Sequence, residues 1–161
     1  TALAMGATVD VVAGPQTAPL PPGARIVRVR TALEMEAAAL SLAGGADFAI
    51  GVAAVADYRP ETVATGKLRR GGEPIDLRLV PNPDVVAGVA ARAKRTLGFA
   101  AEPSGDLAEA RAKLVRKGLW GVAHNDVSDP SIGFGADDNR VTLVTATGEE
   151  RSETRPKALV A

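Results

Sequence analysis

Polar side chains follow three apolar segments of this sequence, at the points where strands of a sheet would end. These side chains are Asp57, Tyr58 and Arg59 after the run 48–55, Glu102 after 96–101, and His124, Asn125 and Asp126 after 120–123. Ligands of open α/β sheets bind beyond the carboxyl ends of parallel strands, so these groups could share one site. Loops are also polar simply because they meet water, and the pattern by itself leaves both interpretations open.

Two groups of cations could bind an anion. Lys113 and Lys117 are four residues apart and share one face of a predicted helix. Lys67-Leu-Arg-Arg70 is a basic cluster in a loop flanked by glycines. Such groups could hold a triphosphate, but a solvated helix face or an ordinary loop has the same composition. Neither G-x-G-x-x-G after a strand nor G-x-x-x-x-G-K-[ST] occurs, so neither standard phosphate-binding loop is present in the sequence.

The composition excludes several classes of protein. The 161 residues are 46% apolar and 24% charged, as in a single globular domain. There is no cysteine and only one histidine, which excludes disulfides and thiolate catalysis and leaves little for a catalytic triad. The 19 basic and 19 acidic residues balance, which argues against nucleic acid as a partner. No apolar run reaches the length of about 18 residues needed to span a membrane, and we expect a cytoplasmic protein.

The chain is expected to fold as a mostly parallel sheet with helices on both faces. The apolar patterns predict strands at 8–13, 25–29, 48–55, 75–79, 96–101 and 120–123, and a C-terminal antiparallel hairpin of 141–145 and 149–155. They predict helices from Thr31 to the glycines at 44–45, from Pro83 towards Lys94, and over 106–117. Strands that alternate with helices indicate an α/β, Rossmann-like three-layer fold.

Both ends of the chain resemble interrupted helices. Residues 1–6 read as the end of a helix that Gly6 terminates, and Arg155 to Ala161 reads as a first helical turn with Pro156 near its start. We therefore expect one domain over residues 1–161, truncated at both ends.

Six motifs occur together in one order. They are Ala53-Ala-Val-Ala-Asp-Tyr-Arg59, Lys67-Leu-Arg-Arg70, Asn82-Pro-Asp-Val-Val86, Gly98-Phe-Ala-Ala-Glu102, Lys113-x-x-x-Lys117-Gly118 and Asn125-Asp-Val-Ser128, with Gly133-Phe134 and Asp138-Asn139 following. In this order they resemble the phosphopantothenoylcysteine synthetase family, the phosphopantothenate–cysteine ligases of coenzyme A biosynthesis. The resemblance extends from Thr8 to about Pro156.

The resemblance implies a CTP- and Mg²⁺-dependent ligase. The carboxylate of 4′-phosphopantothenate would attack the α-phosphate of CTP to give an acyl-cytidylate, and the amine of cysteine would then displace CMP. It also implies a homodimer, with the strand 75–79 as a pairing element, a higher oligomer in fused proteins, and fusion behind an FMN-dependent decarboxylase domain. The enzyme would supply positioning and charge neutralisation rather than a nucleophile.

The resemblance also assigns roles to individual residues. Lys67 would stabilise charge as pyrophosphate leaves, and Asn125, together with Asp126, would contact the acyl phosphate. The residues implied in nucleotide binding are Gly51, Val52, Ala53, Asp57, Lys67, Pro83, Asp84, Val85, Val86, Phe99, Lys113 and Lys117. Asp57 would contact either a ribose hydroxyl or the metal, whose ligands are otherwise unassigned.

The sequence departs from the family pattern at three places. The cluster Lys67-Leu-Arg-Arg70 has arginines where the family often has lysines, and His124 stands where a small residue is common. A Gly/Ser-rich turn with an asparagine needed for the second half-reaction, which lies upstream in the family, is absent from this sequence.

Two other functions stay open at this point. One is an NAD(P)-dependent Rossmann oxidoreductase with its glycine fingerprint upstream, although Val12-Ala-Gly-Pro15 at the end of the strand 8–13 offers no acidic residue to hold a ribose. The other is a non-catalytic nucleotide-binding or oligomerisation module.

Overall fold

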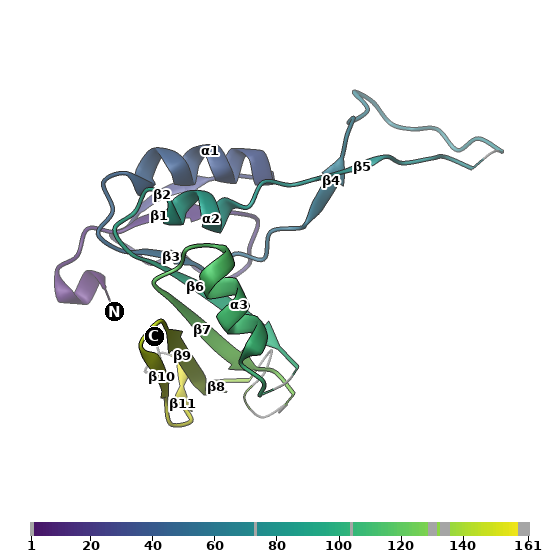
Figure 1. Ribbon diagram of the computed structural model, residues 1–161. Coiled ribbons are helices and arrows are strands. Elements are labelled where there is room, and N and C mark those ends of the chain that lie inside the picture. Colours follow the sequence, from purple (N-terminus) through teal and green to yellow (C-terminus); the bar gives the residue numbers. More distant parts are fainter. Residues whose placement is uncertain (1, 73, 104, 129–131, 133–135, 158–161) are drawn as a thin grey trace.

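The computed structural model describes residues 2–72, 74–103, 105–128, 132 and 136–157 (Figure 1). Its helices are the 3-10 helix η1 (Leu3–Met5) and the α-helices α1 (Ala32–Ala43), α2 (Val85–Ala90) and α3 (Ala108–Arg116). Its strands are β1 (Asp10–Ala13), β2 (Arg25–Arg28), β3 (Ala49–Gly51), β4 (Tyr58–Pro60), β5 (Leu79–Pro81), β6 (Thr96–Glu102), β7 (Gly121–Asp126), β8 (Asp138–Asn139), β9 (Val141–Thr145), β10 (Gly148–Arg151) and β11 (Arg155–Pro156). None of the helices among these residues is long and apolar enough to cross a bilayer.

The central sheet is mixed, and its strand order is β10-β9-β7-β6-β3. Strands β3, β6 and β7 are parallel, and β9 and β10 continue the sheet as an antiparallel hairpin. This arrangement confirms the predicted α/β class and the closing hairpin. It also directs the carboxyl ends of β3, β6 and β7 towards one edge of the sheet.

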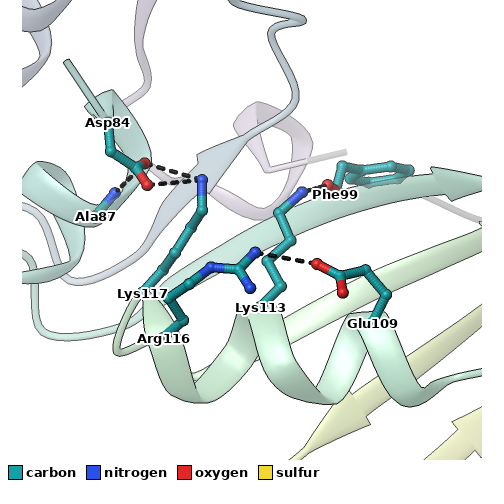
Figure 2. Close-up of polar contacts among 7 residues, drawn as sticks. All are labelled: Asp84, Ala87, Phe99, Glu109, Lys113, Arg116 and Lys117. Carbon is teal, nitrogen blue, oxygen red and sulfur yellow. Dashed lines mark hydrogen bonds and ion pairs between the residues drawn. The ribbon is translucent and has the colours of Figure 1, made fainter. Parts of the chain in front are cut away.

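The core lies between this sheet and the helices α2 and α3. Val122 and Val144 are fully buried on the sheet and pack with Ala110 and Leu114 of α3, and Val86 of α2 joins the same cluster. Apolar side chains on the helix face at 110 and 114 therefore fix α3 over β7 and β9. The two lysines of α3 lie on the side of the helix that faces α2 (Figure 2).

A second, two-stranded parallel sheet of β1 and β2 packs against α1. Helix α1 begins as the sequence predicts, because the Thr31 hydroxyl accepts a hydrogen bond from the Glu34 amide at 3.1 Å. The Glu34 carboxylate reaches back to the Arg30 amide at 2.7 Å, one residue earlier than in an ordinary capping box. The capping interaction thus sets the position of the helix, which packs on α2.

A long arm projects from the body of the molecule (Figure 1). It consists of residues 61–78, which join the antiparallel strands β4 and β5, and its described side chains are all exposed. The predicted strand over 75–79 is wrong for most of its length, because only Leu79 belongs to β5. The Arg78 carbonyl still accepts a hydrogen bond from the Glu61 amide at 3.0 Å, but residues 75–78 belong to no strand pair. Alternating apolar residues do not make a strand without a partner.

The apolar run 48–55 is also not a strand buried on both faces. Only residues 49–51 form β3, and Ile50 is 60% exposed. The reason is the position of β3, which is the last strand in the order of the sheet and has a partner on one side only.

Two further boundaries differ from the prediction. Strand β7 continues through Asn125 and Asp126, which were expected in a loop, because both continue the pairing with β6. At the C-terminus Arg155 and Pro156 form a short strand with β8, and the helical conformation expected from Arg155 begins at Lys157 instead. Residues 158–161 of that expected helix lie outside the described residues, as do Gly133 and Phe134 of the family motif.

An aromatic cluster lies at the amino ends of β3 and β7. The rings of Phe48 and Trp120 meet edge to face with centroids 5.4 Å apart, and the Arg95 guanidinium lies 5.7 Å from the Trp120 ring. These contacts join the segments that lead into three neighbouring strands.

Candidate functional site

The two lysines of α3 point towards neighbouring elements rather than into solvent. Lys113 Nζ donates a hydrogen bond to the Phe99 carbonyl of β6 at 2.5 Å. Lys117 Nζ contacts both carboxylate oxygens of Asp84, at 2.8 and 3.0 Å (Figure 2). The spacing of four residues therefore places both ammonium groups on one side of α3, where Lys113 reaches β6 and Lys117, the C-cap residue of α3, reaches the start of α2.

Asp84 connects the two helices. Its carboxylate caps α2 by accepting a hydrogen bond from the Ala87 amide at 3.1 Å, and the same oxygen accepts from Lys117. Sequence reasoning assigned the cap to Asn82, with Pro83 as the first helical residue. That assignment is wrong, because the side chain of Asp84 is the one three residues before a free amide of α2.

Asp84, Lys113 and Lys117 together form the candidate nucleotide-binding cluster, called the nucleotide cluster below. Burial and neighbouring charges shift the pKa of Asp84 and of Lys113. Burial raises the pKa of Asp84, but hydrogen bonds from Lys117 and from the Ala87 amide outweigh burial, so the net shift is downward. Burial and the neighbouring Lys117 ammonium lower the pKa of Lys113. Lys113 makes no ion pair within the described part of the chain, so its charge is available to an anionic ligand.

The end of β3 lies directly against α2. A Cβ atom at Gly51 would stand 2.8 Å from Cγ2 of Val86, a separation that real side chains do not adopt. Only glycine lets the strand approach the helix this closely. Gly51, Val86 and the buried Val85 thus form a tight junction beside Asp84. Val52 and Ala53 follow β3 and are both exposed. A ligand could therefore reach the backbone of this segment.

The loop after β3 is fastened to the segment before α2. The Asn82 amide donates to the Asp57 carbonyl at 2.7 Å, and the Asn82 side chain donates to the Ala56 carbonyl at 2.8 Å. The Arg59 guanidinium donates to the Pro81 carbonyl at 2.5 Å. These bonds hold the backbone of Asp57 beside Asn82, two residues before Asp84. Sequence reasoning missed this role of Asn82 and Arg59, since both residues appear only as members of motifs.

Lys67 is not brought to the cluster. It lies within the exposed arm between β4 and β5, which points away from α2 and α3 (Figure 1). The structure therefore assembles the nucleotide-binding candidates of β3, α2, β6 and α3, but leaves the predicted catalytic lysine apart from them.

Asn125 lies on β7, and its side chain is on the face of the sheet opposite α2 and α3, because Val122 and Ala100, at the alternate positions of β7 and β6, are the residues packed under these helices. It pairs with Ala101 in the register of β6 and β7, so its side chain shares a face of the sheet with Phe99. Its Oδ1 atom is buried and has no hydrogen-bond partner among the described residues. The side chain is thus able to accept a hydrogen bond, as the predicted contact to a substrate needs.

The described residues offer no ready-made metal site. No group of three or more His, Asp or Glu side chains among them is arranged to hold an ion. Mg²⁺ in nucleotide enzymes is bound largely by phosphate oxygens and water with one or two carboxylates, and the exposed Asp57 and Asp84 can supply these.

Comparison with protein families gives a match over the whole chain. The model of the DFP family, the DNA/pantothenate metabolism flavoprotein C-terminal domain, matches residues 1–161.

Individual relatives agree with this match. The chain is 43% identical over 151 residues to the coenzyme A biosynthesis bifunctional protein CoaBC of Escherichia coli (strain K12), an alignment that covers 90% of this chain and 37% of that protein. It is 42% identical over 150 residues to the protein of the same name from Vibrio cholerae serotype O1, with coverages of 90% and 38%. The chain thus spans well under half the length of these curated relatives.

A solved structure supports the fold. The crystal structure of the C-terminal domain of CoaBC superimposes with a TM-score of 0.77 at 26% sequence identity, over 99% of this chain and 71% of that chain.

Proposed function

Because the chain belongs to the family of the DNA/pantothenate metabolism flavoprotein C-terminal domain, we propose that it carries the phosphopantothenate–cysteine ligase site of coenzyme A biosynthesis. The reaction would use CTP to join 4′-phosphopantothenate and cysteine. The observation that carries this proposal is the cluster in which Lys113, Lys117 and Asp84 meet at the end of β3, where the resemblance implies a nucleotide.

The chemistry needs activation of a carboxylate. The carboxylate oxygen of 4′-phosphopantothenate attacks the α-phosphorus of CTP, the bond to the β-phosphate breaks, and pyrophosphate leaves. The cysteine amine then attacks the acyl carbon, an amide bond forms, CMP leaves and a proton is released from nitrogen. Neither step needs a protein nucleophile, so cation placement is the main task of the protein.

In this proposal the lysines of α3 bind the triphosphate. Among the described residues, Lys113 has only a carbonyl partner, and Lys117 has a single carboxylate that it can exchange for phosphate oxygens. Gly51 to Ala53 would contact the cytidine through the backbone, and Val86 and Phe99 would border its pocket. Mg²⁺ would neutralise the phosphates, and Asp57 is the nearest exposed carboxylate after β3.

The position of Lys67 supports a homodimeric site. The arm carries this lysine away from the cluster of its own chain, and Leu68, Ile75 and Leu77 of the arm expose more than 60% of their surface. Apolar side chains on an unpaired extended segment favour pairing with another chain. The arm would then deliver Lys67 to the nucleotide cluster of a second copy.

The further parts of the proposal concern the longer protein. The relatives' name, a bifunctional protein, supports fusion to a second catalytic unit, for which the resemblance implies an FMN-dependent decarboxylase. A cytoplasmic location fits a pathway enzyme that acts on small polar substrates.

Nucleotide binding tests the site directly. We expect CTP with Mg²⁺ to raise the melting temperature of this chain more than ATP or NADP⁺ does. A ligand at about a hundred times its dissociation constant adds about 2.7 kcal/mol of stability. Lys117→Gln and Lys113→Gln should each weaken CTP binding about tenfold, because each removes a charge-assisted contact. Arg116→Gln is the matched control on the same helix, where Arg116 pairs with Glu109 and should leave binding unchanged.

A complementation assay tests the shared site. At CTP concentrations far below saturation, Lys67→Gln and Lys117→Gln chains should each release little pyrophosphate. A mixture of the two should regain about a quarter of the wild-type rate, because half of the dimers are mixed and one of the two sites in each mixed dimer is intact. A mixture as inactive as its parents would contradict the shared site but leave CTP binding intact. Normal turnover in both single variants would instead favour a non-catalytic module.

A further inference from the structure

A cavity of about 260 Å³ lies on the sheet near the start of α3, apart from the nucleotide cluster. Its lining residues are Gly105, Leu107, His124, Asp126, Arg140, Thr142, Glu149 and Arg151. None of the residues assigned to CTP contributes to it. The cavity is therefore a second concave site of the domain.

The register of the sheet explains how these side chains meet. His124 of β7 pairs with Thr142 of β9, which pairs with Arg151 of β10, so the three form one row across neighbouring strands. Val122, two residues before His124, lies in the core beneath α3. The row therefore continues the helix-covered face of the sheet just beyond the helix. Asp126 and Arg140 occupy the next position, since Asn125 pairs with Val141.

The histidine in this row is buried without a partner. His124 is 2% exposed, and its Nε2 atom has no hydrogen-bond partner among the described residues. Buried polar atoms in folded proteins nearly always have one. An imidazole that lines a cavity and lacks a partner points to a group that binds in that cavity.

The charges of the lining favour an anion. Glu149 is ion-paired with Arg111 of α3, and Asp126 accepts hydrogen bonds from the Ser128 amide at 3.0 Å and the Ser128 hydroxyl at 2.6 Å. Both carboxylates are thus engaged. Arg140 and Arg151 have no ion pair within the described part of the chain, although Arg140 is close enough to Asp126 to lower the pKa of that carboxyl after Ser128 has done so.

We propose that this cavity binds the phosphoryl group of a small phosphorylated molecule. Two guanidinium groups supply paired donors that match phosphate oxygens, and the Thr142 hydroxyl and the imidazole of His124 supply two more. Of the cavity residues, the resemblance links Asp126 alone to the ligase reaction, and Asp126 donates nothing to the bound phosphate, so the proposal does not depend on the ligase function. A phosphorylated effector or inorganic phosphate would use the same contacts.

The single histidine of the chain provides a local test. In a ¹H–¹⁵N spectrum of the imidazole, every signal comes from His124. Inorganic phosphate and pyrophosphate are titrated separately at constant ionic strength and pH, with chloride as the reference salt. We expect a saturable shift of the His124 signals with at least one of the two phosphates and none with chloride. The more tightly bound phosphate then indicates whether a single or a linked phosphoryl group fits.

Variants separate this site from the nucleotide cluster. Arg140→Gln and Arg151→Gln should each weaken the titration about tenfold, as expected for loss of a charge-assisted contact. Arg28→Gln, an exposed change on β2 with the same loss of charge, and Lys117→Gln should leave it unchanged. Phosphate that fails to shift the His124 signals, or that binds both arginine variants as tightly as the wild-type chain, would overturn the proposal.

Discussion

The ion pair of Lys117 and Asp84 is the residue-scale feature on which the candidate nucleotide site depends. A single carboxylate serves as the cap of α2 and as the partner of a lysine on α3. Because Asp84 contacts both groups in its charged form, its protonation state couples the stability of the junction to pH.

This coupling predicts a pH-dependent effect of Asp84→Asn. The folded pKa of Asp84 lies below its ordinary value of about 3.9, so the charged form stabilises the fold above that pH. This contribution is lost as the pH falls through the folded pKa. Asp84→Asn should therefore lower the free energy of unfolding at neutral pH, and the difference from wild type should shrink below about pH 4.

Urea denaturation at neutral and acidic pH measures this difference. Asp76→Asn, an exposed change on the arm, is the control that alters charge without altering the junction. A difference for Asp84→Asn that stays constant across this range would show that the carboxylate charge is not what holds α2 and α3 together.

At the scale of elements, the contact of β3 with α2 fixes how closely these two elements of the candidate nucleotide site approach each other. Gly51→Ala would place a methyl group 2.8 Å from Val86. Overpacking of this kind costs about 1–3 kcal/mol, and we expect a loss of stability in that range with weaker CTP binding. Val86→Ala in the same chain should recover part of the loss, because it removes the clashing atom.

Gly44→Ala is the matched control for this prediction. Gly44 has a φ of −64°, and nothing lies within 4 Å of a Cβ built there, so the change should alter stability by no more than about 0.5 kcal/mol. Equal melting temperatures for Gly51→Ala and Gly44→Ala would refute the tight junction.

The elements also show which parts of the fold can be predicted from the sequence. The helix at Thr31, strand β6 and the presence of the terminal hairpin were predicted correctly, because capping groups and apolar runs act over a few residues. The second strand of the hairpin, predicted over 149–155, ends at Arg151. Strand β3 was predicted too long, and β5 was predicted too early in the chain, because the extent of each depends on a neighbouring strand rather than on its own pattern.

The candidate site likewise contains parts that could be predicted from the sequence and parts that could not. The placement of Lys113 and Lys117 on one side of the helix followed from their helical spacing. Their contacts with Phe99 and Asp84 join residues of three of the sequence motifs. The fastening of the Asp57 loop by Asn82 and Arg59 was not predictable, because it joins segments more than twenty residues apart through backbone carbonyls. The position of Lys67 depends on the direction of the arm, which no local pattern encodes.

At the scale of the whole molecule, the arm is separable from the folded body. Replacement of residues 62–77 by a short glycine-rich turn should retain the pairing of Pro60 with Leu79 and change the free energy of unfolding by less than about 1 kcal/mol. Pyrophosphate release should be lost together with Lys67, and self-association should weaken. Thermal melts and sedimentation velocity measure these effects, and a collapse of the melting temperature would show that the arm supports the core.

The aromatic cluster at the amino ends of the strands has a spectroscopic consequence. Trp120 is the only tryptophan of the chain, and its ring touches Phe48 immediately before β3 and the Arg95 side chain immediately before β6. Its emission therefore reports whether the edge strand is docked on the sheet. Fluorescence of this one indole can therefore follow detachment of β3 without any label, at the opposite end of the strands from the proposed nucleotide site.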